Sequence, residues 1–277
     1  MKIVLTGASS GIGRHLALTL AAEHQIWGIA RNKSVLQGVK REAGTTFYET
    51  SGDVSSWPSL QSIVELVSDV WSDCDALICC AGIVTPIGKA MTQDPELWAR
   101  SLRTNLDGTF FAIRAFYDLL MSSERRAKVI CFSGGGATGP RENFSAYGAA
   151  KAGVVRLTET LSVEWSNENI DINVVAPGAI ATGMTDVVIE AGLEKAGERE
   201  FSGAQQQRQR SWDNEELTRV FDLVSYLLSP ASDGISGKLI SAVWDPWRSF
   251  DGHKTAIIDS DIYTLRRIVP SDRGLDW

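Results

Sequence analysis

Short apolar, β-branched runs alternate along the chain with longer segments in which apolar residues recur every three or four positions. The first pattern is typical of β-strands and the second of amphipathic helices. We expect strands at 2–6, 26–30, 45–49, 75–80, 127–133, 170–176 and 238–243. The run from Ala76 to Cys80 is apolar throughout, which indicates a strand that is covered on both faces.

Helical stripes lie between these strands, within 60–71, 106–120, 154–165 and 217–227. Regular alternation of strands and helices predicts an α/β protein with three layers and a parallel, doubly wound sheet of about seven strands. Ligands bind outside the carboxyl ends of the strands in such sheets. The loops of interest therefore lie around 7–13, 31–32, 81–88, 133–145 and 177–212.

Length and charge narrow the functional classes. A chain of 277 residues is long enough for a sizeable core without a second domain. The net charge of −7 argues against a general nucleic-acid or membrane-surface binder, although it leaves room for a local phosphate site. We find no leader pattern and no apolar stretch of membrane-spanning length, and we expect a cytoplasmic protein.

The sulfur and imidazole groups do not suggest a metal centre. The chain has four cysteines, three of them inside apolar runs: Cys74, Cys79, Cys80 and Cys131. Its three histidines are scattered along the sequence. No metal-ligand spacing results, and we expect free thiols in a reducing compartment.

A glycine-rich turn follows the first predicted strand, with Gly7, Gly11 and Gly13 placed before a helix that begins near Ile12. Glycines let the chain turn tightly and let backbone amides approach phosphate oxygens, and the helix adds its positive N-terminal end. This turn, which includes Ser9 and Ser10, is a candidate pyrophosphate site.

The second strand ends at Ala30-Arg31, where an NAD site would carry a carboxylate for the ribose diol. An arginine at this place favours the 2′-phosphate of NADP(H) over NAD(H). Asp53-Val54, after the third strand, is a candidate adenine contact, and an ordinary turn aspartate is an almost equal alternative.

Tyr147 and Lys151 are separated by four residues in a helical pattern and therefore share one helix face. A neighbouring ammonium lowers the pKa of a phenol, which suits the phenol for proton exchange with a carbinol or carbonyl oxygen. The pair sits about one helix before a strand that ends in Pro177-Gly178.

These segments, in this order and spacing, resemble the short-chain dehydrogenase/reductase family: the glycine turn at 6–13, Asn-Leu-Asp-Gly at 105–108, the segment 147–151, and 177–182. The resemblance covers about residues 1–243 and implies a Rossmann fold. It implies a catalytic proton relay of Tyr147, Lys151 and Asn105, with a serine hydroxyl beside it. It also implies that the following residues bind NAD(P): Gly7, Ser9, Ser10, Gly11, Ile12, Gly13, Arg31, Asp53, Val54, Ala81, Gly82, Asn105, Tyr147, Lys151, Pro177, Gly178, Ile180 and Thr182.

The chain departs from the family pattern at two places in the predicted site. Cys79-Cys80-Ala81-Gly82 stands where the family has Asn-Asn-Ala-Gly, so two amide groups that brace the sheet become thiols. Counting back from Tyr147 puts the serine position at Gly134, with Ser133 one residue upstream. A one-residue loop insertion would restore Ser133, which we favour; otherwise Thr138 or Ser145 supplies the hydroxyl, or none does.

Two segments lie outside the simple pattern. The stretch 185–212 is polar and is expected to be a mobile lid. Its charges hint at a polar, sugar-like or anionic substrate: Glu194, Lys195, Glu198, Arg199, Glu200, Arg208 and Arg210. We treat 1–243 as one catalytic domain and 244–277, with Trp244, Trp247 and Trp277, as an extension that packs on it or on a neighbouring subunit.

The sequence therefore predicts an NAD(P)(H)-dependent alcohol dehydrogenase or carbonyl reductase acting on a small molecule. The resemblance implies a homodimer or homotetramer formed through helices 100–121 and 145–166. A nucleotide-sensing or scaffolding protein with weakened catalysis is the main alternative, supported only by the two departures above. A nucleotide-sugar epimerase is disfavoured, because that branch of the family spaces its glycines differently.

Overall fold

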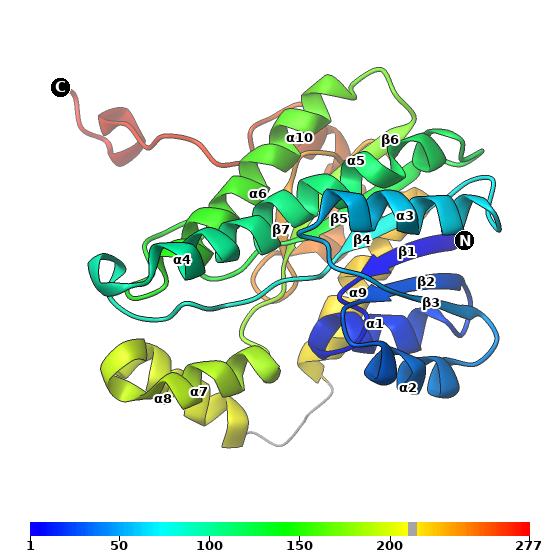
Figure 1. The fold of residues 1–277 in the computed structure, drawn as a ribbon. Coiled ribbons are helices and arrows are strands. Elements are labelled where there is room, and N and C mark those ends of the chain that lie inside the picture. Colours follow the sequence, from blue (N-terminus) through cyan, green and yellow to red (C-terminus); the bar gives the residue numbers. More distant parts are fainter. Residues whose placement is uncertain (210–214) are drawn as a thin grey trace.

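One parallel sheet organises the molecule (Figure 1). The computed structural model describes residues 1–209 and 215–277. Within these ranges seven strands pair in the order β3-β2-β1-β4-β5-β6-β7, which confirms the expected doubly wound α/β fold. The strands are β1 (Lys2–Thr6), β2 (Gln25–Ala30), β3 (Phe47–Ser51), β4 (Ala76–Cys79), β5 (Ala127–Phe132), β6 (Ile170–Ala176) and β7 (Leu239–Ser241).

Helices cover both faces of the sheet (Figure 1). On one face lie α1 (Gly11–Leu20), α2 (Lys33–Ala43) and α9 (Glu215–Leu228), and on the other α3 (Trp57–Ser68), α5 (Gly108–Met121) and α6 (Ser145–Glu164). Successive side chains of a strand point to opposite faces, so Ile3 and Leu5 enter one core and Val4 the other. Both faces of the central strands are therefore apolar, as the uninterrupted runs predicted.

The third strand begins two residues later than expected, at Phe47 rather than at position 45. Phe47 pairs with Ile26, and its ring fills the space beside Gly28, where a Cβ would lie 2.2 Å from the ring. Packing of the Phe47 ring fixes the register of β3 against β2. Strand propensity along the chain does not predict this register.

A π-helical turn (Arg103–Asp107) joins α4 (Pro95–Leu102) to α5. An extra residue in such a turn rotates the following helix relative to a regular α-helix, and π turns are frequent at functional sites. In α5, Phe110, which lies within the predicted stripe 106–120, is 42% exposed, whereas Ile113 and Phe116 are buried. The turn also buries Asn105 beneath the segment that follows β4.

The stretch expected to be a loop-like lid consists mainly of two helices, α7 (Gly183–Ala196) and α8 (Glu198–Gln209). They pack against each other and lie apart from the two helical layers (Figure 1). Gly192 and Gly197, both with positive φ, interrupt the helical pattern and hide it from sequence inspection. Arg210 and the rest of that stretch to 212 lie outside the described residues.

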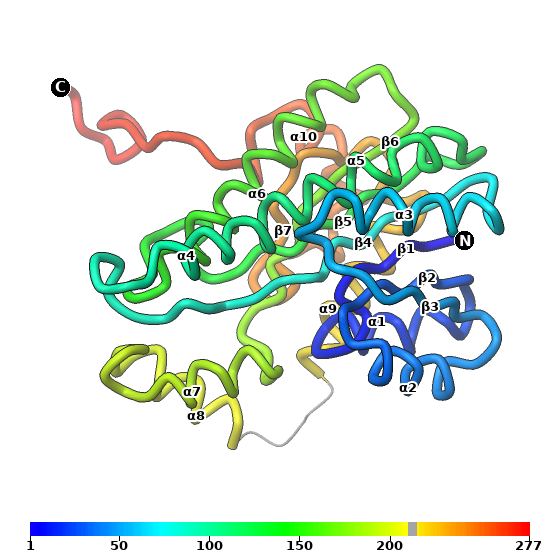
Figure 2. Tube along the Cα trace, viewed as in Figure 1, coloured from blue at the N-terminus to red at the C-terminus, as the bar shows by residue number. Residues whose placement is uncertain are grey.

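The segment after β7 packs on the sheet before the chain leaves it. Trp247 and Phe250, in a 3₁₀ turn (Trp247–His253), join the core under α9, followed by α10 (Lys254–Ile258). The amide of Leu239 donates to the Tyr263 carbonyl, so this segment also covers the edge of β7. Residues near the C-terminus then extend away from the body (Figure 2). No helix in the described part of the chain is both long and apolar enough to cross a membrane.

Removing the Trp247 side chain tests how much this segment stabilises the domain. Trp247 is 5% exposed, whereas Trp244, three residues earlier, is 83% exposed. We expect Trp247→Ala to lower the free energy of unfolding by about 3–5 kcal/mol because it leaves a large cavity in the core. Trp244→Ala is the matched control, with an expected change within about 0.5 kcal/mol in urea unfolding. Equal effects of the two substitutions would contradict this packing.

Candidate active site

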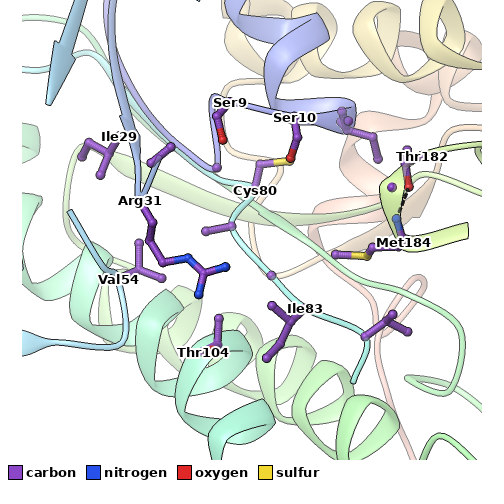
Figure 3. Close-up of a pocket in the computed structure, with 18 of the residues that line it drawn as sticks. Ser9, Ser10, Ile29, Arg31, Val54, Cys80, Ile83, Thr104, Thr182 and Met184 are labelled. Carbon is purple, nitrogen blue, oxygen red and sulfur yellow. Dashed lines mark hydrogen bonds between the residues drawn. The ribbon is translucent and has the colours of Figure 1, made fainter. Parts of the chain in front are cut away.

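A cavity of about 340 Å³ opens at the carboxyl ends of β1 and β4, where the strand order reverses direction (Figure 3). Loops after four strands and the start of α7 line it, as expected for a ligand site in a doubly wound sheet. The lining includes most of the predicted cofactor residues: Gly7, Ser9, Ser10, Gly11, Ile12, Arg31, Asp53, Val54, Ala81, Gly82 and Thr182.

Steric requirements explain the glycines of the first turn. Gly7 has a φ of 73°, and a Cβ there would lie 2.7 Å from the amide nitrogen of Ala81. At Gly13 a Cβ would lie 2.3 Å from the Gly7 carbonyl oxygen. The glycines thus let the turn pack directly on the segment after β4, and α1 begins at Gly11 beside the cavity. Free amides and the positive helix end suit a pyrophosphate at this place.

Arg31 extends from the end of β2 into the space between Val54 and Thr104 (Figure 3). A second, shallow recess adjoins it and is lined by Ser9, Arg31, Asn32, Lys33 and Ser34. Lys33 and Ser34 were missed in the sequence analysis, although they directly follow the arginine that we singled out. Arg31, Lys33 and Ser34 together offer two cations and a hydroxyl near the predicted ribose position.

Asp53 lines the cavity and also forms a turn, and its expected adenine contact stays a prediction. Its Oδ1 accepts hydrogen bonds from the Ser55 amide (2.9 Å) and hydroxyl (2.7 Å). Burial raises the pKa of this carboxyl, but these hydrogen bonds and the charges of Arg31 and Arg100 outweigh it, so the pKa lies below its usual value. An ionised Asp53 is therefore available as an acceptor at neutral pH.

Asn105 is fully buried and braces the backbone after β4. Its amide nitrogen donates to the Ile83 carbonyl (2.8 Å), and its Oδ1 accepts from the Ile83 amide (3.1 Å). A Cβ on Gly82 would lie 2.7 Å from Oδ1 of Asn105 and 3.8 Å from Nζ of Lys151. Only the backbone of Gly82 thus lies between the cavity and the two polar groups, Oδ1 of Asn105 and Nζ of Lys151.

Tyr147 and Lys151 lie on the first two turns of α6 and are buried, with exposed fractions of 7% and 5%. Nζ of Lys151 lies 5.8 Å from the centre of the Tyr147 ring and donates to the Phe132 carbonyl (2.8 Å). Burial lowers the pKa of Lys151 and raises that of Tyr147. The phenol pKa therefore lies above its usual value and not below it, because burial outweighs the positive charge of Arg141.

Gly134, not Ser133, faces the phenol. A Cβ on Gly134 would lie 2.1 Å from the Tyr147 hydroxyl oxygen. The loop insertion that would have brought Ser133 to the phenol is therefore not present. The Ser133 amide donates to the Val175 carbonyl (2.9 Å), and Ser133 is buried one residue upstream of Gly134. Of the other two candidates, Thr138 is exposed and Ser145 accepts a hydrogen bond from Trp98 (3.1 Å).

The segment after β6 contributes to the cavity through its last residues. Thr182 caps α7 and lies within 3.4 Å of where a Gly11 side chain would project. Gly178 instead packs against Val243, and Ile180 contacts the core under α9. Pro177, Gly178 and Ile180 are not part of the cavity lining among the described residues, and their expected cofactor contacts stay predictions.

An apolar cluster surrounds Tyr147 on the side of α7 and α8. Besides Tyr147, its buried members are Val84, Phe144, Val188, Ala196 and Ala204, joined by half-buried residues such as Met184 and Phe201. Sequence inspection missed it, because its residues come from four segments. Most of the charges that suggested a polar substrate are exposed: Glu194, Lys195, Glu198, Arg199 and Arg208. Glu200 is half-buried and pairs with Arg141.

The cysteines are free thiols, as predicted. Cys79 and Cys131 are paired neighbours on β4 and β5, and Cys80 lines the cavity. Burial raises the pKa of Cys80 to about 12, so this thiol is protonated at neutral pH. The described residues contain no group of three or more side chains suited to hold a metal ion.

Comparisons with known proteins show the family of the chain. The family model for short chain dehydrogenases matches residues 1–191. The 3-oxoacyl-[acyl-carrier-protein] reductase FabG of Escherichia coli is 33% identical over 186 residues, 66% of this chain and 75% of its own. Benzil reductase ((S)-benzoin forming) of Saccharomyces cerevisiae is 27% identical over 191 residues, 66% of this chain and 72% of its own.

Solved structures show the same fold. The KRED1-Pglu enzyme superposes with a TM-score of 0.77 at 21% identity, covering 87% of this chain and 100% of its own. An actinorhodin polyketide ketoreductase in a crystal with NADPH superposes with a TM-score of 0.74 at 26% identity, covering 86% of this chain and 94% of its own. The chain belongs to the short-chain dehydrogenase/reductase family and is an NAD(P)-dependent oxidoreductase acting on carbonyl and carbinol groups.

Proposed function

We propose that the protein is an NADP(H)-dependent carbonyl reductase or alcohol dehydrogenase in which Tyr147 exchanges the proton. One observation carries the proposal: Gly82 lines the cavity, and Oδ1 of Asn105 and Nζ of Lys151 lie directly behind it. Two residues of the proposed proton relay are therefore one glycine away from the cavity that the glycine turn lines. A protein that only binds nucleotide has no need of this arrangement.

Each residue has a defined part in the proposed reaction. The nicotinamide ring, when bound, supplies or accepts the hydride. In reduction the Tyr147 hydroxyl donates its proton to the substrate oxygen, and in oxidation its phenolate accepts that proton. The Lys151 ammonium stabilises the phenolate, and Asn105 holds the backbone of Ile83 in place. Burial raises the pKa of Tyr147 and keeps it protonated at neutral pH, which favours reduction.

Preference for NADP(H) rests on the end of β2. Arg31 and Lys33 meet at the recess beside Ser9, and both cations suit a 2′-phosphate. The adjoining carboxylate, Asp53, is held by Ser55 and lies after β3, not at the end of β2 where a ribose-binding carboxylate would stand.

The substrate is proposed to be an apolar ketone or the corresponding alcohol. The side chains beside Tyr147 are mainly apolar, whereas most charges of α7 and α8 point to solvent. The names of the curated relatives, reductases of 3-oxoacyl groups and of benzil, support a carbonyl substrate. The expected homo-oligomer stays a prediction; exposed Phe110 and Met121 on α5 suit the contact expected through helices 100–121 and 145–166.

Removing one oxygen atom at Tyr147 tests the proton exchange. We expect Tyr147→Phe to lower kcat for NADPH-dependent reduction of apolar ketones by about 10²–10⁴-fold. NADPH binding, followed by fluorescence, is expected to persist. Tyr117→Phe, which removes a hydroxyl that donates to Glu168, is the matched control. A wild-type protein that binds NADPH but reduces no ketone of a broad panel would favour the sensing alternative.

Cofactor preference is tested at the end of β2. We expect Arg31→Met to weaken NADPH binding by about 10–100-fold, because a charge-assisted contact with the 2′-phosphate is lost. NADH binding should change by less than about threefold. Arg41→Met, on the exposed side of α2, controls for loss of surface charge. Equal weakening of NADPH and NADH would argue against the 2′-phosphate contact.

The close contact between Gly134 and the phenol can be tested with a single methyl group. Gly134→Ala places a Cβ within 2.8 Å of three atoms of the Tyr147 side chain, so the ring must move. We expect kcat to fall by about 10²-fold, since small displacements of a catalytic group are costly. Gly139→Ala, in the same loop with no heavy atom within 4 Å, should retain activity. Comparable activity of both variants would show that the phenol position is not critical.

A further inference from the structure

Arg141, in the loop between β5 and α6, lies beside Tyr147 and was not singled out by sequence. Its guanidinium carbon lies 5.9 Å from the centre of the Tyr147 ring, almost the same distance as the Lys151 ammonium at 5.8 Å. The side chain is only 19% exposed, so solvent screens its charge less than that of a surface arginine.

Two independent contacts fix the guanidinium. It lies over the Phe144 ring, 3.9 Å from the centre, and Phe144 is fully buried. Its Nε and Nη2 both donate to Oε2 of Glu200 on α8, at 3.0 and 2.6 Å. A stacked and doubly hydrogen-bonded arginine has little freedom to turn away from the phenol.

The three consecutive glycines after β5 make room for this arrangement. A Cβ on Gly134 would meet the Tyr147 phenol, and one on Gly135 would lie 3.3 Å from Cδ and 3.4 Å from Nη1 of Arg141. Gly136 has a φ of 100°, and a Cβ there would lie 2.9 Å from Cα of Gly148. The segment that lacks a hydroxyl at Gly134 is thus also the segment on which Arg141 lies.

We propose that Arg141 is a positioning residue that stabilises the anionic form of Tyr147 in place of the hydroxyl missing at Gly134, and that Glu200 on α8 moderates its charge. The inference rests on the proposed function, because it assigns Tyr147 to the proton exchange. It also gives α8 a role in the chemistry, since the moderating carboxylate belongs to that helix.

The other charged and titratable groups around the phenol do not replace Arg141. Lys151 approaches from α6 itself, and Cys80, a protonated thiol, from the end of β4. On α7, which presents Met184 and Val188, Asp186 pairs with Arg208, and Glu190 is exposed. Arg141 is the neighbouring charge that acts to lower the pKa of Tyr147 against the effect of burial.

The test is the pH dependence of kcat for Arg141→Met, Arg141→Lys and Glu200→Gln. Loss of the cation is expected to move the apparent pKa of the Tyr147-dependent limb upward by about one unit, and loss of the carboxylate to move it downward. Arg141→Lys should restore most of the wild-type position, because it keeps a positive charge. Arg248→Met is the matched control: Arg248 lies over Trp247, 4.2 Å from its centre, and pairs with Asp222, far from the site in sequence.

A second measurement separates this inference from the proposed function. Carbon-13 NMR at Cζ of tyrosine follows phenol ionisation without turnover, and Tyr147→Phe identifies the resonance among the five tyrosines. We expect the Tyr147 pKa to be lowest in Glu200→Gln, intermediate in the wild type and highest in Arg141→Met. The inference is overturned if active Arg141→Met protein has the wild-type apparent pKa in kcat and the wild-type Tyr147 pKa by NMR. If the order holds while the wild type reduces no ketone, the inference stands and the proposed function fails.

Discussion

Close approach of backbone segments at the carboxyl ends of β1, β4 and β5 is the constraint on which the site depends. Gly7 lies against Ala81, Gly82 against Asn105, and Gly134 against the Tyr147 phenol. A single methyl group at any of the three would meet an atom within 2.8 Å. Because these three positions are glycines, the glycine turn, the cavity and the buried phenol can lie close together.

Burial sets the electrostatics of that arrangement. Tyr147 and Lys151 are almost fully removed from water, and burial therefore shifts the pKa of each side chain in the direction of its neutral form. Positive charge near the phenol then matters more than it would at the surface, because screening is weak. Arg141 meets this condition from a loop, and Glu200 connects it to the helices that cover the apolar side of Tyr147.

The departure from the family pattern at 133–136 is better understood as a rearrangement than as a loss. Gly134 removes a hydroxyl donor, but Gly135 leaves space for the guanidinium of Arg141. Likewise Cys79 and Cys80 stand where the family has asparagines, while Ala81 keeps the close contact with Gly7 and Gly82 the one with Asn105. Both segments retain small residues where the backbone approaches most closely.

The sequence by itself determined the strand–helix alternation, the glycine turn, Arg31 and the Tyr147–Lys151 pair, because each depends on local periodicity or on residues close together in the chain. Tertiary structure decided the rest. The helical character of 183–209 was hidden by two glycines, and the register of β3 depends on the Phe47 ring beneath Gly28. The choice between Ser133 and Gly134, and the presence of Arg141 beside Tyr147, depend on which side chains point toward one cavity. That direction is fixed by packing between segments far apart in sequence, which no local pattern records.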